Sequence, residues 1–236
     1  SIVDILAVLY GRVMQYRSNE PKWVNRDRFI LSKGHAGAGV YAVLAECGFF
    51  NIAELDKHYQ DGSIFSGHVS HKGVPGVELS TGSLGHGLPV ASGMALAAKI
   101  DKKSHKIFVV MSDGELDEGS NWEAFMFASH HELNNLTAVI DRNKLQSMKT
   151  TEETLSLEPL RDKLIAFGWN VIEVDGHNHD ELFSAIDSDT KKPKVIIANT
   201  IKGKGVSFME NEIAWHYRTP SGELFDQAMK ELGEKT

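Results

Sequence analysis

Short apolar runs rich in Val and Ile alternate along the chain with longer segments of helical periodicity. The uninterrupted apolar runs are typical of buried strands, and the periodic segments are typical of helices. We predict strands at residues 28–31, 106–111, 136–140, 169–174 and 194–199. We predict helices at residues 2–16, 40–47, 88–100, 122–133, 157–167 and 179–187. The alternation indicates an α/β fold, a parallel sheet with helices on both faces.

A glycine-rich segment, residues 60–87, interrupts this alternation and contains seven glycines. Ordered loops of this length in compact domains are usually functional. We find no repeat, linker or low-complexity stretch elsewhere, so we predict one domain over residues 1–236. Because the chain opens inside a predicted helix without an initiator Met, we also expect that it is truncated at its N-terminus.

Composition narrows the class of protein. The chain is 42% hydrophobic and 24% charged, which is typical of a globular protein. It has no apolar run long enough to span a membrane, and its net charge of −7 argues against a nucleic-acid partner. The single cysteine, Cys47, indicates a reducing compartment, so we expect a cytoplasmic protein. A local anion site remains compatible with the acidic charge, since helix N-termini and metal ions hold phosphate.

Polar clusters follow two of the predicted strands, at residues 112–114 and 141–143. Ligands of parallel sheets bind beyond the carboxyl ends of the strands, and a right-handed crossover can place two such ends side by side. A carboxylate and an amide oxygen suit Mg²⁺, with Ca²⁺ or Mn²⁺ as possible substitutes. We therefore predict a metal held by Asp113, Asn143 and the backbone carbonyl of Leu145. Taken singly, these residues are more often strand-exit turns or caps.

The spacing of this pair leads to a family resemblance. Asp113-Gly114 and Asn143, with 28 residues between them, resemble the fingerprint of thiamine diphosphate enzymes, although Ser112 replaces its first glycine. Further motifs occur in the order of the N-terminal half of transketolase: Ser32-Lys33-Gly34-His35, Ser66-Gly67-His68, Pro75-Gly76-Val77-Glu78, Thr81-Gly82-Ser83-Leu84-Gly85-His86-Gly87, Gly203-Lys204-Gly205 and Trp215-His216. The run at residues 203–211 resembles transketolases split into two polypeptides.

The resemblance implies a thiamine diphosphate-binding fold that uses thiamine diphosphate and Mg²⁺. It implies transfer of a two-carbon ketol unit from a ketose or its phosphate to an aldose. The family places three catalytic histidines around the cofactor, and the matching positions are His35, His68 and His216. The implied cofactor-binding residues are His35, Gly82, Ser83, Leu84, Gly85, His86, Asp113, Gly114, Glu115, Asn143 and His216.

The resemblance also implies a partner chain. The glutamate that activates the cofactor in this family lies in a pyrimidine-binding domain, and nothing in this sequence resembles that domain. The upstream Gly-His motif of transketolases is missing as well. We therefore expect this chain to be inactive alone, to pair with a C-terminal subunit, and to form a dimer of heterodimers that acts on sugar phosphates. Glu118 and Glu123 match acidic positions at the family's dimer interface.

Two other functions remain open. The first is a different thiamine diphosphate enzyme, such as a deoxyxylulose-phosphate synthase or a component of a 2-oxo acid decarboxylase or dehydrogenase. The motifs around His68 and Gly82 favour transketolase over these enzymes. The second is a non-catalytic phosphate-binding module, which explains the strands and glycines but not the ordered histidines.

Overall fold

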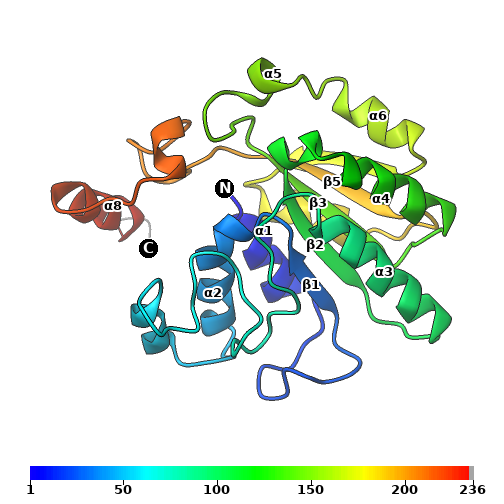
Figure 1. Ribbon diagram of the computed structural model, residues 1–236, viewed down its shortest axis with the longest axis horizontal. Coiled ribbons are helices and arrows are strands. Elements are labelled where there is room, and N and C mark those ends of the chain that lie inside the picture. The colour runs from blue at the N-terminus through cyan, green and yellow to red at the C-terminus, as the bar shows by residue number, and fades with distance from the viewer. Residues whose placement is uncertain (234–236) are drawn as a thin grey trace.

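A five-stranded parallel sheet forms the centre of the computed structural model, which describes residues 1–233 (Figure 1). In spatial order its strands are β1 (Arg28–Leu31), β2 (Ile107–Ser112), β3 (Leu136–Arg142), β5 (Lys194–Asn199) and β4 (Asn170–Asp175). Neighbouring strands pair in parallel throughout. The predicted α/β class and all five predicted strands are confirmed.

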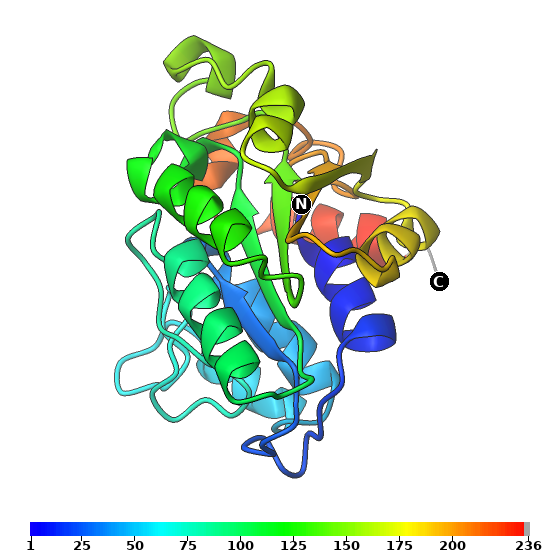
Figure 2. The ribbon, with the colours of Figure 1, turned by 90° about the vertical axis from the view of Figure 1, so that its right-hand side faces the viewer.

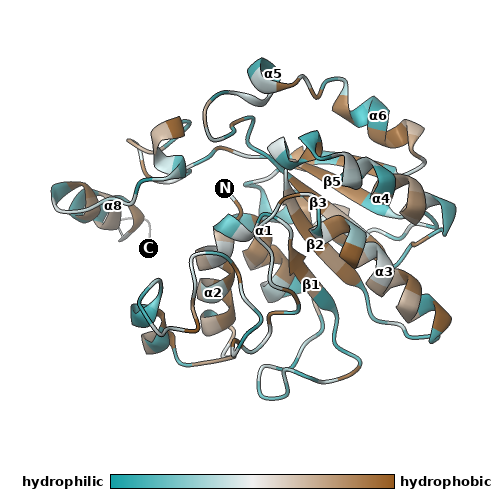
Figure 3. Cartoon of the chain, in the orientation of Figure 1, coloured by the Kyte–Doolittle hydropathy of each residue, from teal (hydrophilic) through white to brown (hydrophobic). Residues whose placement is uncertain are grey.

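The strands are buried on both faces, which is why they read as continuous apolar runs. Successive side chains of β2 point to opposite sides of the sheet. Phe108 and Val110 join one core cluster, whereas Ile107, Val109 and Met111 join the other. Figure 3 shows the strands as the most apolar part of the fold, between helices that are polar on their outer surfaces.

One helical layer covers each face of the sheet, as Figure 2 shows. The first layer contains α1 (Val3–Val8), α2 (Gly37–Glu46) and α7 (His179–Asp187). The second contains α3 (Gly87–Ile100), α4 (Gly119–His130) and α6 (Leu160–Ala166). The described residues include no helix with both the length and the apolar character needed to cross a membrane.

Several helix boundaries differ from the prediction. The helix expected at residues 2–16 is shorter, because α1 passes into a π-helical turn, η1 (Leu9–Val13), and Met14 is extended. The helix expected at 157–167 starts only after Pro159, which is its N-cap. Two helices were not predicted: α5 (Thr151–Thr154), which follows a Thr150 capping box, and α8 (Glu223–Gly233). Four 3₁₀ segments complete the described elements: η2 (Gly34–Ala36), η3 (Ile52–Lys57), η4 (Gly114–Asp117) and η5 (Ile213–His216).

The glycine-rich segment is anchored to the carboxyl end of β1. The Thr81 hydroxyl donates to the carbonyl of Leu31, and the Val69 N–H donates to the Gly34 carbonyl over 2.9 Å. A Cβ on Gly34 would lie 2.1 Å from the Thr81 carbonyl oxygen, so only glycine allows this approach. The loop is therefore packed against the sheet edge where the polar clusters lie.

Candidate functional site

A cavity of about 300 Å³ opens beyond the carboxyl ends of the central strands. Its walls come from the end of β1, the glycine-rich segment, the turns after β2 and β3, and the segment after β5. The lining residues are Lys33, His35, His68, Gly82, Leu84, Ser112, Gly114, Asn143, Leu145, Gln146, Ser147, Lys202, His216 and Tyr217. Its location is the one expected for a ligand of a parallel sheet.

Three histidines that are far apart in the sequence meet in this cavity. His35, His68 and His216 all line it, and the ring centroids of His35 and His216 are 5.3 Å apart. Five other predicted site residues line it with them: Gly82, Leu84, Gly114, Asn143 and Leu145. Eight of the predicted positions therefore share one space, and they can act on one ligand.

Asp113 does not line the cavity: it lies between the lining residues Ser112 and Gly114, fully buried directly after β2. Its carboxylate accepts from the backbone N–H groups of Gly114, over 2.8 Å, and Lys144, over 2.6 Å. The Arg142 guanidinium is 3.2 Å from the same carboxylate. Burial raises the pKa of Asp113, while these donors act in the opposite direction. An additional cation beside this carboxylate would offset the cost of burying its charge.

Asn143 lies in the turn after β3, directly beside the residue that binds Asp113. Its Nδ2 donates to Asp141 over 3.2 Å, and its Oδ1 accepts from the Leu145 N–H over 3.0 Å. Lys144, between them, has a φ of 65° and directs its own N–H at Asp113. The carboxylate of Asp113 and the turn of residues 143–145 thus form one hydrogen-bonded unit.

The donor set of this unit decides which metal it fits. Across residues 1–233, no three His, Cys, Asp or Glu side chains gather in a group that could hold a metal. The predicted set instead combines one carboxylate, one amide oxygen and one backbone carbonyl. Such hard oxygen ligands suit Mg²⁺, Ca²⁺ or Mn²⁺, with phosphate or water completing the shell, and do not suit a thiolate- or imidazole-type metal.

Two lysines that sequence reasoning missed make the cavity cationic. Lys33 is buried, with its ammonium beside Asp141, and Lys202 Nζ lies 3.1 Å from His216 Nδ1. Burial lowers the pKa of Lys202, and the charge of Lys33 lowers it further. Desolvation, followed by the charge of Lys33, also lowers the pKa of His35 to about 3. The cavity therefore favours an anion and keeps His35 neutral. Only the Ser-Lys-Gly-His motif gave a signal for Lys33, and no signal separated Lys202 from other lysines.

Asp141 is a further residue that the prediction missed. It is fully buried and accepts from Lys33, Thr200, Ser1 and the Asn143 amide. Burial alone would raise the pKa of Asp141, but the Lys33 charge and these donors hold it below its ordinary range. Because Asn143 Nδ2 donates to Asp141, Asp141 fixes which end of that amide carries the acceptor oxygen. Its position two residues before Asn143 was the available signal.

The remaining predicted residues lie outside the cavity lining. Ser83 and His86 are exposed, and His86 Nδ1 is 2.9 Å from the Leu84 carbonyl. Glu115 is fully buried, where its carboxylate accepts from the N–H groups of Gly85, over 2.9 Å, and Ser112, over 3.2 Å. The Glu115 side chain therefore connects the glycine-rich segment to the end of β2 through hydrogen bonds. Any contact it makes with a cofactor in the cavity would have to use its backbone.

The sequence matches one family along almost its whole length. A model of the transketolase thiamine diphosphate-binding domain covers residues 1–235. A subunit of the apulose-4-phosphate transketolase of Phocaeicola vulgatus is 45% identical, over 100% of this chain and 84% of its own. The 6-deoxy-6-sulfo-D-fructose transketolase subunit SqwG of a Clostridium species is 44% identical, over 98% of this chain and 86% of its own.

Solved structures agree with this match. A transketolase of Pichia stipitis in complex with sedoheptulose-7-phosphate superimposes with a TM-score of 0.92 at 30% identity, over 98% of this chain. A Campylobacter jejuni transketolase gives a TM-score of 0.89 at 31% identity, over 97% of this chain. This chain spans only 36% and 37% of those two chains, so it corresponds to about a third of each.

Proposed function

Because the chain belongs to the transketolase family and forms its thiamine diphosphate-binding domain, we propose that it is the diphosphate-binding subunit of a two-chain ketol transferase. The reaction would move a two-carbon ketol unit from a ketose or ketose phosphate to an aldose or aldose phosphate. One observation carries the proposal: His35, His68 and His216 line one cationic cavity together with Asn143 and Leu145.

The floor of the cavity fits a metal-bound diphosphate. We assign Mg²⁺ to the Asp113 carboxylate, the Asn143 amide oxygen and the Leu145 carbonyl, where Ca²⁺ or Mn²⁺ can substitute. Lys33 and Lys202 add positive charge beside this position. Backbone groups of Gly82, Ser83, Leu84, Gly85, His86, Gly114 and Glu115 are the proposed neighbours of the cofactor. A Cβ at Gly114 would lie 2.8 Å from the side chain of Gln146, so that side chain would have to move.

The histidines form the proposed substrate-facing part of the site. Thiamine diphosphate, when bound, supplies the carbon nucleophile that carries the two-carbon unit between sugars. His35, His68 and His216 would hydrogen-bond the sugar hydroxyls and hold charge that develops near them. A neutral His35 can both donate and accept, which suits a hydroxyl partner. Lys202 beside His216 Nδ1 would fix the orientation of that ring.

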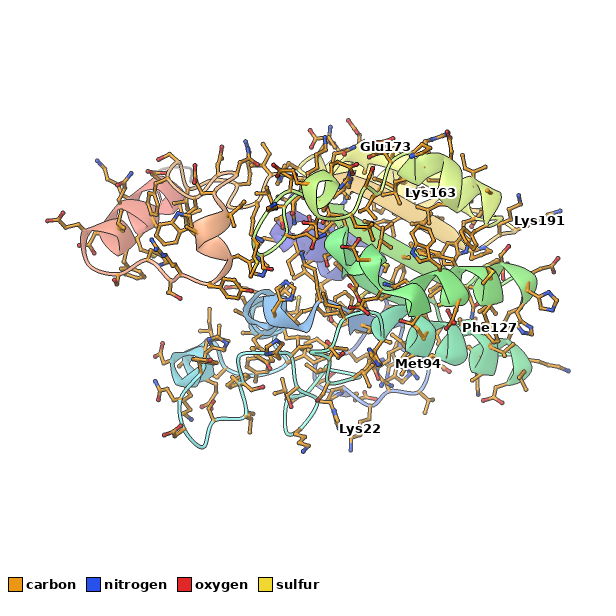
Figure 4. All side chains as sticks on the ribbon, turned by 45° about the horizontal axis from the view of Figure 1, so that its top comes forward. Lys22, Met94, Phe127, Lys163, Glu173 and Lys191 are labelled. Atoms are coloured by element: carbon orange, nitrogen blue, oxygen red, sulfur yellow. The ribbon has the colours of Figure 1, made fainter. Side chains whose placement is uncertain are left out.

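The proposed enzyme contains a second, different polypeptide and acts as a dimer of heterodimers in the cytoplasm. The names of three relatives support the second polypeptide, since each of the three is called a transketolase subunit. A groove between α3 and α4 supports self-association: Phe127 and Glu123 line it, and Met126 is 53% exposed nearby. Figure 4 shows Phe127 and Met94 projecting from these two helices. Glu118 is exposed at the start of α4, as an interface role requires.

The test is reconstitution with a defined companion chain. The companion is the polypeptide of the same genome that matches the part of single-chain transketolases absent from this chain. We expect ketol transfer only when both chains, thiamine diphosphate and Mg²⁺ are present. Turnover by this chain alone would contradict the proposal, and so would a mixture that uses pyruvate but no ketose as donor.

A further inference from the structure

Helix α8 stands apart from the rest of the described fold. Figure 1 shows it beyond the segment that carries η5, away from the sheet and both helical layers. The contacts that hold it include two hydrogen bonds from Ser207, through its N–H and its hydroxyl, to the Glu231 carboxylate. Neither core cluster contains a residue of α8. The helix therefore lies outside the cooperative interior of the domain.

One face of α8 is apolar although it is exposed. Phe225, Ala228, Met229 and Leu232 recur at helical spacing and form a stripe, and Leu224 flanks it. Ala228 is buried, so the helix rests on the domain along that edge. Phe225, Met229 and Leu232 are 49%, 54% and 51% exposed. A contiguous apolar stripe of this kind on a surface helix marks an interaction site.

The position of α8 indicates what covers it. The chain runs from His216 and Tyr217, which line the cavity, to the first residue of α8 within a few residues. Because this connection is short, a second polypeptide that covers the cavity beside His216 would also lie close to α8. Three relatives of this chain are named as transketolase subunits. Single-chain transketolases of this fold have nearly two thirds of their length outside the matched region. Under the proposed function, the companion chain supplies the equivalent of that length.

We propose that the apolar stripe of α8, Phe225, Met229 and Leu232, docks into the companion chain of the two-chain enzyme. This inference rests on the proposed function, because it names the surface through which that chain binds. Asp226 stands beside the stripe and is exposed. The complementary surface is therefore an apolar groove with a basic residue at its rim. Docking there would also fix the segment that carries His216 at the cavity.

The experiment measures binding of the companion chain to variants of this chain. Phe225→Asp and Met229→Asp place a charge on the stripe, and burying that charge is costly. We expect each to weaken association at least about 30-fold, with an unchanged kcat once saturated by companion chain. Val24→Asp is the matched control, because Val24 is 66% exposed but lies in the loop before β1. We expect the control to bind like the parent chain, and Phe225→Leu to retain most of the affinity.

Three outcomes would overturn the inference. The first is unchanged companion affinity in the Asp variants while the parent chain binds, which would leave the proposed function intact. The second is weaker binding in the Asp variants that comes with a loss of α-helix content or thermal stability, if Asp226→Lys, which reverses the charge beside the stripe, then binds the companion chain as the parent does. The third is a change in self-association of this chain, measured by sedimentation, without any change in companion binding. Absence of binding by the parent chain would instead refute the proposed function.

Discussion

The carboxyl edge of the sheet and the C-terminal arm, residues 202–233, differ in how their side chains are held. At the sheet edge, Lys33, Asp113 and Asp141 are buried, and each carboxylate accepts from at least two donors. In the arm, Tyr217 is 78% exposed and Met229 is 54% exposed. The domain thus holds the charged residues at the sheet edge by its own packing. The arm, which carries His216, has a stripe that the described residues leave about half exposed.

The largest expected effect comes from breaking the buried ion pair of the sheet edge. Lys33→Met leaves the Asp141 carboxylate buried without its cationic partner. We expect the free energy of unfolding to fall by about 3–5 kcal/mol, the usual cost of an uncompensated buried charge. Urea denaturation followed by circular dichroism measures this loss. The double variant Lys33→Met/Asp141→Asn removes both charges and should recover part of it.

The exposed pair of Lys57 and Glu54 provides the control for that experiment. Its side chains are 59% and 44% exposed, so Lys57→Met should lower the free energy of unfolding by less than about 1 kcal/mol.

The pH dependence of stability gives a second check on the buried pair. Because the pKa of Asp141 is lowered in the fold despite burial, its stabilising effect is present above its ordinary pKa of about 4 and is lost as the pH falls. If Lys33→Met and Lys57→Met lowered the free energy of unfolding equally, the contrast between the buried and the exposed ion pair would be refuted.

The next effect concerns the cofactor. Asp113→Asn keeps the size of the side chain and its place at the end of β2 but removes the charge beside the proposed metal position. We expect the affinity of the two-chain complex for thiamine diphosphate with Mg²⁺ to fall about 100-fold, or about 2.7 kcal/mol, by calorimetry. Asp175→Asn, an exposed carboxylate at the end of edge strand β4, should leave the affinity unchanged. Unchanged affinity in Asp113→Asn would refute the metal assignment.

The contrast between the packed sheet edge and the exposed arm also explains which parts of the structure could be predicted from the sequence. The strands follow from buried Val and Ile runs, and the boundaries of β1, β5 and α7 agree with the prediction because turn residues delimit them sharply. Asp113 and Asn143 could be placed at neighbouring strand ends from topology alone. Helix α8 was missed, although the spacing of Phe225, Ala228, Met229 and Leu232 has a helical period that the sequence shows.

Charged residues of the cavity were harder to predict. Lysines are usually solvated, so nothing in the local pattern indicated that Lys33 and Lys202 would line one cavity. Their environment depends on β1, β3 and the segment after β5 meeting at the sheet edge. Glu115 was assigned to the cofactor by resemblance, whereas its carboxylate binds Gly85 and Ser112 within the domain. The family pattern gives the position of a residue but not the direction of its side chain.

A smaller effect is expected in the pH response of His35, where the two regions meet. The pKa of His35 is lowered to about 3, first by desolvation and then by Lys33 and His216. An unfolded histidine has a pKa of about 6.5, so this group stabilises the fold fully above that pH and progressively loses its contribution as the pH falls towards 3. Titration of the His35 ring by NMR should show a neutral imidazole at pH 5. His35→Gln assigns the signal, and a midpoint near 6.5 would contradict the effect of the neighbouring positive charges on this ring.

The smallest effect tests whether the arm is energetically separate from the sheet. Ser207→Ala removes the hydroxyl that donates to Glu231 over 2.8 Å and leaves the backbone N–H donor in place. One such hydrogen bond contributes about 1 kcal/mol, so hydrogen exchange in α8 should accelerate about 5-fold. Global unfolding should change by less than about 0.5 kcal/mol, since α8 lies outside both core clusters.

Ser188→Ala is the matched control for this exchange measurement. It removes a hydroxyl that donates to the Ala185 carbonyl over 2.8 Å, at the end of α7, and should leave exchange in α8 unchanged. A global loss above about 1 kcal/mol in Ser207→Ala would show that the arm unfolds together with the sheet. Adding the companion chain should slow exchange in α8 for both variants, because docking buries the stripe. Such protection would mean that the companion chain orders the arm that carries His216, while the sheet edge is already ordered without it.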